Sequence, residues 1–269
     1  MTKDKVKFAP LEKSLFFPTL KKRVDQYFAD NRQSRYANKT MIVKTVVLLC
    51  IYIVPYVLLL VFTPPFAVSL LLWLLMGTGI SGIGMSVMHD ANHGAFSRRP
   101  WVNKWMGRTI YLAGAGVVNW KLQHNVLHHT YTNVADLDED IKDRGVLKLS
   151  PHDKAGPMHR FQWMYAFLFY GIVTLYWVLL KDFIQYYHFI RSGVNRQGKA
   201  ENRRMLTGLV LMKTVYLSIF FVIPVFAASI VFWQVLLGFF LMHFVAGLVL
   251  TVIFQLAHSV EGTHLPVAQ

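Results

Sequence analysis

Residues 66–93 read FAVSLLLWLLMGTGISGIGMSVMHDANH, and this stretch decides the fold. Its first part, Phe66–Met88, carries no charged side chain and exceeds the roughly 20 apolar residues that a helix needs to cross a bilayer. His89 and His93 follow at once, four residues apart. In an α-helix this spacing places both rings on one face, one turn apart. The stretch therefore predicts a membrane span that delivers a pair of imidazoles at its end.

Three other stretches are equally apolar and complete two hairpins. They are Thr45–Phe62, Leu206–Phe232 and Val235–Ala257, with turns at Thr63–Pro65 and at Trp233–Gln234. The sequence therefore predicts an all-α integral membrane protein with four transmembrane helices arranged as two hairpins. The returning helix of each hairpin ends on a histidine, His89 in the first and His258 in the second.

Two further apolar stretches, Met106–Val118 and Phe161–Leu180, are predicted to be interfacial helices. The first is too short to cross a bilayer. The second is rich in Tyr and Trp, which favour the headgroup level of a membrane. If the second crossed alone, His258 would end on the face opposite to His89, so the shared depth of these histidines favours an interfacial position.

The distribution of charge predicts which face is cytoplasmic. The chain has 269 residues, is 54% hydrophobic and carries a formal net charge of +14, which excludes an ordinary soluble domain. Of its 28 Lys and Arg residues, 11 lie in residues 1–44, 16 lie in residues 89–205, and the last is Lys213. Apolar stretches separate these blocks, so we expect the basic residues to meet anionic lipid headgroups, not nucleic acid. The sequence therefore predicts a multi-pass protein of the bacterial inner membrane, with the histidines on the cytoplasmic side.

Five segments follow from these features. Residues 1–40 form a cytoplasmic basic N-terminal segment, 41–88 the first transmembrane hairpin, and 89–205 a cytoplasmic histidine-rich helical cap with interfacial helices. Residues 206–258 form the second hairpin, and 259–269 begin a C-terminal cap. The single cysteine, Cys50, lies inside an apolar stretch, which excludes an intrachain disulfide.

A second histidine cluster points to a metal site. His124, His128 and His129 lie in the loop between the hairpins, on the face that receives His89 and His93. Imidazole suits iron, zinc and copper. A zinc protease would carry H-E-x-x-H, and a structural zinc site would add cysteines, so neither pattern fits. Five imidazoles exceed the needs of one tetrahedral ion, which indicates two metals or further ligands elsewhere.

At these residues the chain resembles the membrane fatty-acid desaturase family, which also includes hydroxylases. The carrying motifs are Met88–Ala95 (MHDANHGA), Asn119–Asn133 (NWKLQHNVLHHTYTN) and Phe254–His258 (FQLAH). The resemblance covers nearly the whole chain. Within the family, the chain is most similar to the bacterial linoleoyl-CoA-desaturase-like, front-end branch.

The resemblance implies an oxygen-dependent fatty acyl desaturase with two iron ions. Its substrate would be an acyl-CoA or an acyl lipid. Its electrons would come from a separate donor, a ferredoxin or a cytochrome-type carrier with its reductase. The implied iron ligands, which are also the catalytic residues, are His89, His93, His124, His128 and His129, with His258 as a further ligand. Asp90, Asn92 and Asp136 are predicted to orient the ligand rings, with Asp138 as a further acidic candidate. The resemblance implies that Asn119 and Trp120 border the acyl chain.

Three alternatives stay open at this point. One is an acyl-chain hydroxylase with the same metal site. Another is a metal-binding membrane protein without catalysis, although such a carrier should place ionisable residues along its spans. The third is an inactive fragment, because the family carries a third box, H/Q-x-x-H-H, beyond the fourth span, and no such motif occurs before Gln269. The expectation from this pattern is a C-terminal cap truncated before the third box.

Overall fold

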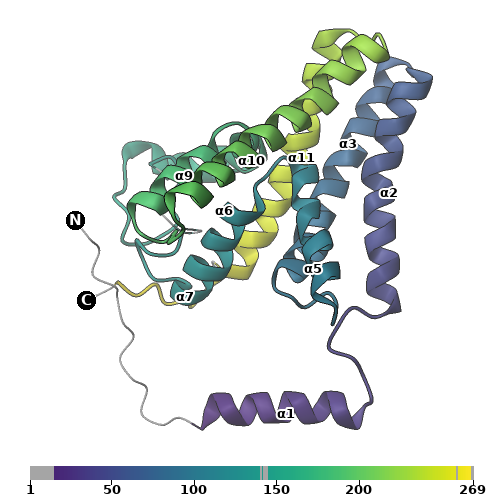
Figure 1. The fold of residues 1–269 in the computed structure, drawn as a ribbon. Coiled ribbons are helices and arrows are strands. Elements are labelled where there is room, and N and C mark those ends of the chain that lie inside the picture. Colours follow the sequence, from purple (N-terminus) through teal and green to yellow (C-terminus); the bar gives the residue numbers. More distant parts are fainter. Residues whose placement is uncertain (1–14, 140, 142–144, 259, 268–269) are drawn as a thin grey trace.

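The computed structural model describes residues 15–139, 141, 145–258 and 260–267, and the His258 side chain lies outside this description. Within these ranges every regular element is a helix, apart from an isolated parallel bridge between Ala135 and Val267 (Figure 1). The all-α fold predicted from hydropathy is therefore confirmed. Through this bridge, the chain after α11 contacts the loop that follows the second histidine cluster.

The helices fall into long apolar ones and short ones near the histidines. The α-helices are α1 (Phe16–Asp30), α2 (Lys39–Phe62), α3 (Phe66–Gly82), α4 (His89–Asn92), α5 (Pro100–Gly107), α6 (Val117–Lys121), α7 (His129–Tyr131), α8 (Gln162–Tyr176), α9 (Asp182–Arg191), α10 (Lys199–Leu217) and α11 (Phe232–His258). The π-helical stretches are η1 (Ile83–Met88), η3 (Leu122–His128), η5 (Trp177–Lys181) and η6 (Ser218–Ala227), and the 3₁₀ stretches are η2 (Arg108–Ala113) and η4 (Pro157–Phe161).

Five continuous helical runs are long and apolar enough to cross a membrane. They are Lys39–Phe62, Phe66–Asn92, Pro157–Arg191, Lys199–Ala227 and Phe232–Ala257. Four of them correspond to the four predicted spans, and Pro157–Arg191 contains the stretch predicted to be interfacial. Length and composition alone do not separate this fifth run from the other four.

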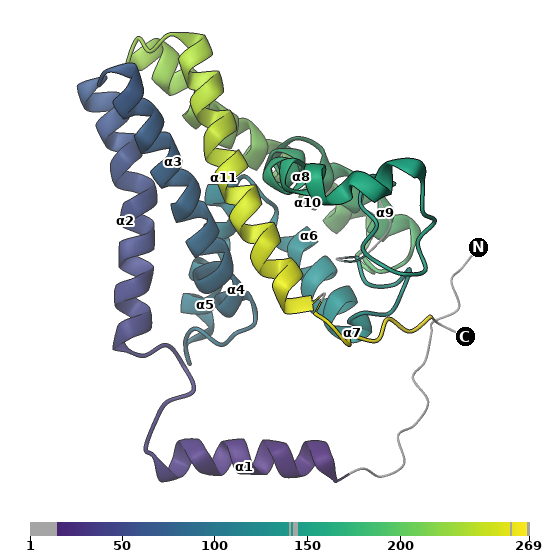
Figure 2. The same cartoon turned by 180° about the vertical axis from the view of Figure 1, so that it is seen from behind.

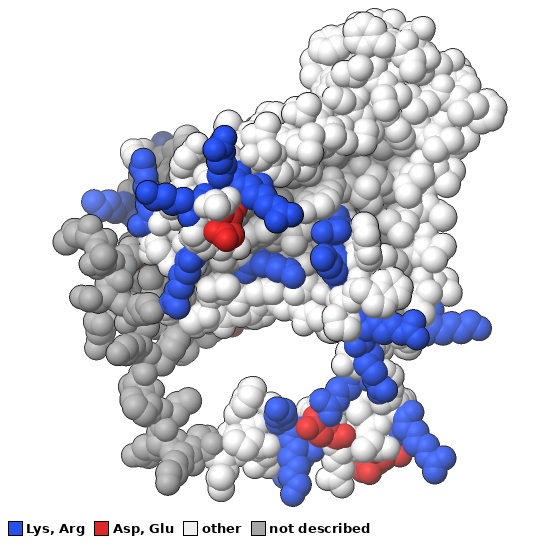
Figure 3. Space-filling view, in the orientation of Figure 1, with Lys and Arg blue, Asp and Glu red and all other residues white. Residues whose placement is uncertain are grey.

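Two of the connections between the long helices lie at one end of the molecule. The α2–α3 turn and the η6–α11 connection sit together at the top of Figure 1, and α5 and α7 lie toward the opposite end. Figure 3 shows Lys and Arg around the lower and left parts of the same face and none at the top. In Figure 2, α2, α3 and α11 run lengthwise, whereas α8 is foreshortened beside α11.

Glycines let the central helices approach closely. A Cβ on Gly77 of α3 would lie 2.5 Å from Met242 O of α11, and one on Gly247 of α11 would lie 2.4 Å from Gly171 O of α8. Backbones in contact at small residues are the usual packing of helices within a membrane. Around these contacts lies a core that includes Trp73, a residue that is 3% exposed. Helix α11 thus packs between α3 and α8.

The third predicted span ends earlier than the sequence indicated. Its helix stops at Ala227, not at Phe232, and the connection lies at residues 228–231, not at Trp233–Gln234. Pro224 has no N–H, and the helix around it is π-helical. Its carbonyl accepts from Ile230 N at 3.0 Å, and Ser229 takes a left-handed φ of 53°. The proline therefore ends the helix within one turn, a change that hydropathy does not register.

Polar side chains inside the bundle are joined to one another. His243 of α11 lies 2.9 Å from Tyr216 Oη and 3.1 Å from Thr174 Oγ1, so it makes the interhelical hydrogen bonds expected of a buried polar group. Lys213 Nζ lies 2.7 Å from Asp182 Oδ2, and both side chains are buried. The one basic residue inside a predicted span is therefore held in an ion pair.

Candidate metal centre

The first histidine pair follows a π-helical turn. Stretch η1 ends at Met88, α4 begins at His89, and His93 N donates to His89 O at 3.1 Å. The centroids of the two rings are 4.6 Å apart. The pair thus lies on one face across one turn, as the spacing predicted. Gly94, with φ of 74°, turns the chain away immediately afterwards.

Two histidines of the second cluster lie in a π-helical stretch. His124 and His128 belong to η3, and their rings stack with centroids 5.3 Å apart. His129 begins α7 and is exposed. Its ring meets that of His124 edge to face at 4.7 Å. π-Helical turns inside α-helices occur frequently at functional sites. Here the wider turn brings consecutive histidines toward the first pair.

The two clusters converge on one point. Nε2 of His124 lies 3.1 Å from Nε2 of His89 and 3.3 Å from Nε2 of His129. One ligand atom each from His89, His93 and His124 lies within 4.8 Å of the others. Two nitrogens bound to one ion at about 2.1 Å are roughly 3.0–3.4 Å apart at octahedral to tetrahedral angles. The nitrogen separations therefore fit ligands of a shared metal ion.

The electrostatics of the cluster favour neutral rings. Desolvation, followed by the charges of neighbouring His89 and His129, lowers the pKa of His93 to about 4 and the pKa of His124 to about 2. Both imidazoles are therefore neutral near pH 7, with a lone pair available. Protonation of several imidazoles packed this closely is unfavourable, whereas a divalent cation can bind the lone pairs of more than one of them.

A buried carboxylate orients His128. Its Nδ1 lies 3.0 and 3.1 Å from the two carboxylate oxygens of Asp138, and both side chains are buried. Because a carboxylate only accepts, Nδ1 carries the proton and Nε2 is the lone-pair nitrogen. Asp138 also accepts from Asn133 N at 2.9 Å. The sequence-predicted Asp136 is exposed in the same turn, and Asp90 contacts His89 Nδ1 at 3.2 Å.

The oriented ring gives a direct prediction. We expect Asp138→Asn to lower metal affinity or activity by about 10–100-fold, because the amide leaves His128 with a poorer acceptor. The matched variant Asp136→Asn should change little, and asparagine tolerates the left-handed φ of 64° at this position. Metal content and turnover are the measurements. A larger loss from Asp136→Asn than from Asp138→Asn would indicate that Asp136 is the carboxylate that orients a ligand histidine.

Asparagines join the two histidine clusters. Asn125, between His124 and His128, donates to Asn92 O at 3.1 Å. The Asn92 side chain in turn donates to Gly107 O at 3.1 Å, where a Cβ on Gly107 would lie 2.4 Å from Asn92 Oδ1. Asn92 is therefore a spacer that fixes α4 against both α5 and η3. This role is consistent with the supporting position predicted for it.

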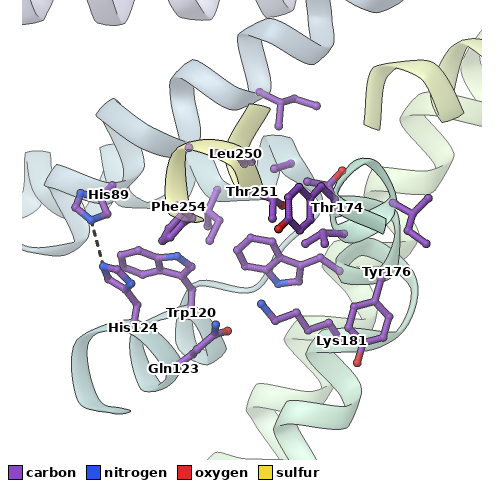
Figure 4. Close-up of a pocket in the computed structure, with 18 of the residues that line it drawn as sticks. His89, Trp120, Gln123, His124, Thr174, Tyr176, Lys181, Leu250, Thr251 and Phe254 are labelled. Atoms are coloured by element: carbon purple, nitrogen blue, oxygen red, sulfur yellow. Dashed lines mark hydrogen bonds between the residues drawn. The ribbon is translucent and has the colours of Figure 1, made fainter. Parts of the chain in front are cut away.

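An apolar cavity of about 480 Å³ opens from the histidines. His89 and His124 form one end of it, and Tyr176 and Lys181 lie toward the other (Figure 4). Phe254 and Thr251 of α11 form part of the wall. A long apolar pocket with metal-ligating groups at one end suits an alkyl chain held against a reactive centre.

Of the two residues expected beside the substrate, only Trp120 is among those that line the cavity. Its ring stacks on His124 at 4.5 Å and meets His89 edge to face at 5.9 Å. Asn119 is 1% exposed and donates to Asp182 O at 2.6 Å. Asn119 thus anchors α6, which leads into η3, to α9. His258 ends α11, and its side chain lies outside the described residues, so its predicted ligand role stays a prediction.

Nearly the whole chain is similar to known proteins of one family. Residues 64–269 match the fatty acid desaturase family. The chain belongs to this family. It is 29% identical to the sn-1 linoleoyl-lipid 6-desaturase of Synechocystis sp., over 98% of this chain and 72% of that protein. It is 30% identical to the protein of the same name from Arthrospira platensis, over 97% and 69% of the two chains. An acyl-lipid (8-3)-desaturase of Physcomitrium patens is 29% identical over 98% and 55%. No solved structure matches.

Membership of this family confirms the resemblance to front-end desaturases found in the histidine motifs. The chain is an oxygen-dependent fatty acyl desaturase, an oxidoreductase of lipid metabolism. The desaturase family implies a metal and oxygen, and the histidine cluster is compatible with holding the metal. Sequence reasoning did not single out Asp182, because the carboxylate gains its meaning only from contacts with distant Asn119 and Lys213.

Proposed function

We propose that this desaturase uses two iron ions held by His89, His93, His124, His128 and His129, with His258 as a further ligand. The convergence of imidazole nitrogens at 3.1 and 3.3 Å carries this proposal. When bound, iron with molecular oxygen supplies an oxidant strong enough to break unactivated C–H bonds, which no side chain can do. Iron suits imidazole ligands, and the catalytic role of the five histidines follows from holding it.

The residues of the chain hold and orient the substrate. The apolar cavity excludes water and accepts an alkyl chain, while Trp120 closes the wall beside His124. The position of the bond that becomes unsaturated is set by how far the chain extends past His89 and His124. The histidines are kept in position by hydrogen bonds to Asp90 and Asp138 and by the contact between Asn92 and Asn125.

The substrate proposed is a fatty acyl group esterified in a membrane lipid. The two cyanobacterial relatives carry the name sn-1 linoleoyl-lipid 6-desaturase, which makes a linoleoyl group at the sn-1 position the first substrate to test. An acyl lipid reaches the cavity from within the bilayer, and the long apolar helices place the protein there.

The proposed electron donor is a separate ferredoxin or cytochrome-type protein. Lys and Arg gather on the lower and left parts of the face shown in Figure 3. Lys104 lies on α5, Arg108 begins η2 and Lys121 ends α6. An acidic carrier would be attracted to such a face. The same asymmetry supports a cytoplasmic histidine face in a bacterial inner membrane, because basic residues favour the cytoplasmic side.

We infer four membrane crossings, with α8 and α9 along the interface. The foreshortening of α8 beside α11 in Figure 2 supports this arrangement. So does the position of α4, which continues the α3 run and begins at His89, near the end of α11 at His258. Labelling of a cysteine introduced by Pro64→Cys with an impermeant external reagent is expected. A reaction of Lys154→Cys, whose position is exposed, with that reagent would place the cap on the outer face instead.

Product analysis tests the activity itself. The protein is supplied with oxygen, a reduced ferredoxin system and a lipid carrying a labelled linoleoyl group at sn-1. We expect a trienoic product that forms only with oxygen, together with iron in the purified protein. A hydroxylated product would indicate the alternative chemistry, and turnover by iron-free protein would exclude the proposed centre.

The shape of the cavity gives a second prediction. Thr251→Phe should lower the turnover of long acyl chains by on the order of tenfold or more, because the ring fills space that the chain occupies. Iron content should be unchanged. The matched variant Ile253→Phe lies two residues further along α11 on a side chain that is 41% exposed, and it should behave as the parent. Equal activity of the two variants would exclude this cavity as the acyl site.

A further inference from the structure

Helix α1 lies apart from the rest of the described chain. It runs crosswise to α2, at the end of the molecule that carries the histidines (Figures 1 and 2). None of its residues is buried. The connector to α2 is tied to the histidine end, because Ala37 N donates to Phe96 O at 3.1 Å, three residues after His93. The helix is therefore held near the level at which α2 begins.

One side of α1 is an apolar stripe. Phe17, Leu20, Val24 and Tyr27 recur at spacings of three and four residues, so their positions fall within about 80° of the helix circumference. These side chains are 72%, 44%, 43% and 57% exposed. A contiguous apolar stripe of this kind marks an interaction site, and no part of the chain that the structure describes buries it.

Basic residues border the stripe. At 3.6 residues per turn, Lys21 projects beyond one edge of the stripe and Arg23 beyond the other, while Lys22 points away from it. Residues 15–44 contain seven Lys or Arg and two Asp. Long basic side chains beside an apolar stripe place their charges among lipid phosphates while the apolar groups enter the acyl boundary.

The connector leaves the stripe uncovered. Arg35 pairs with Asp25 and lies over the ring of Phe28 at 5.8 Å. Asp25 is on the polar side of α1, so this contact folds the connector against that side. The eight residues 31–38 reach at most about 28 Å, which keeps α1 close to the bilayer surface that α2 enters.

We propose that α1 is an in-plane membrane helix that docks the histidine end of the protein on anionic lipid. Its apolar stripe enters the boundary between headgroups and acyl chains, and Lys21 and Arg23 bind lipid phosphates. This arrangement fixes the depth of the histidine end relative to the membrane from which an acyl lipid arrives. The proposal rests on the amphipathic pattern of α1 and does not depend on the identity of the metal.

Accessibility of spin labels in nanodiscs tests the depth of α1. In a Cys50→Ser background, labels are placed by Val24→Cys on the stripe and by Gln26→Cys two residues further on the polar side. The discs contain an equal mixture of phosphatidylcholine and phosphatidylglycerol. We expect the Val24 label to be relaxed mainly by oxygen and the Gln26 label mainly by a water-soluble nickel chelate. Because no residue of α1 is buried, neither change should disturb the rest of the fold.

Two results would overturn the proposal. Equal access of the nickel chelate to both labels would place α1 in water, and protection of the Val24 label from both reagents would place the stripe on protein. A charge-reversal variant tests whether α1 binds anionic lipid. Lys21→Glu with Arg23→Glu should raise nickel access to the Val24 label in the mixed discs and change it little in pure phosphatidylcholine. No change in the mixed discs would exclude recognition of anionic lipid.

Discussion

The variant His124→Ala is expected to lose its metal and its desaturase activity to background. Its Nε2 is the atom that lies within 3.1 Å of His89 Nε2 and 3.3 Å of His129 Nε2, so its removal takes away the centre of the ligand set. Trp120 also loses the ring on which it stacks. The measurements are iron per protein by elemental analysis and acyl products from a labelled lipid.

The matched control is His188→Ala. His188 lies on α9, where its Nε2 is 3.6 Å from Glu139, and its side chain is 43% exposed. We expect parental iron content and turnover from this variant, since a partly exposed surface histidine is not part of the convergent cluster. Parental iron and activity in the His124 variant would show that the cluster is not the metal centre.

The second large effect concerns the buried ion pair between α10 and α9. We expect Lys213→Met to destabilise the protein by about 3–5 kcal/mol, because the Asp182 carboxylate would remain buried without a cation. Lys213 Nζ also donates to Gly114 O at 2.6 Å and to Trp177 O at 2.8 Å, so two carbonyls lose a donor as well. Thermal unfolding in detergent should reveal a lower Tm.

A double variant separates charge from shape. Lys213→Met with Asp182→Asn removes both charges, and we expect it to recover part of the lost stability. Recovery should be incomplete, because Asp182 also accepts from Gly116 N at 2.9 Å and from Trp177 Nε1 at 3.1 Å. Lys199→Met, at the exposed start of the same helix, is the control and should leave Tm unchanged. A single variant as stable as this control would show that the pair contributes nothing.

The ion pair shows where sequence reasoning stops. From the sequence, Lys213 is an interruption near the start of an apolar stretch, and Asp182 is one acidic residue among several. Their meaning depends on a contact between residues 31 positions apart in sequence. Periodicity describes positions along one segment, and composition describes only how often each residue type occurs. Neither one predicts a contact between side chains on separate helices.

The sequence by itself determined the helical class, the apolar runs and the identity of the histidine clusters, because hydropathy and residue spacing are local properties. It also placed His89 and His93 on one face of a helix. Only the tertiary structure decided that η1 and η3 are π-helical, that His124 meets His89 and His129, and that Asp138 orients His128. These features depend on how separate helices pack, since a wider turn is stabilised by contacts that lie outside its own segment.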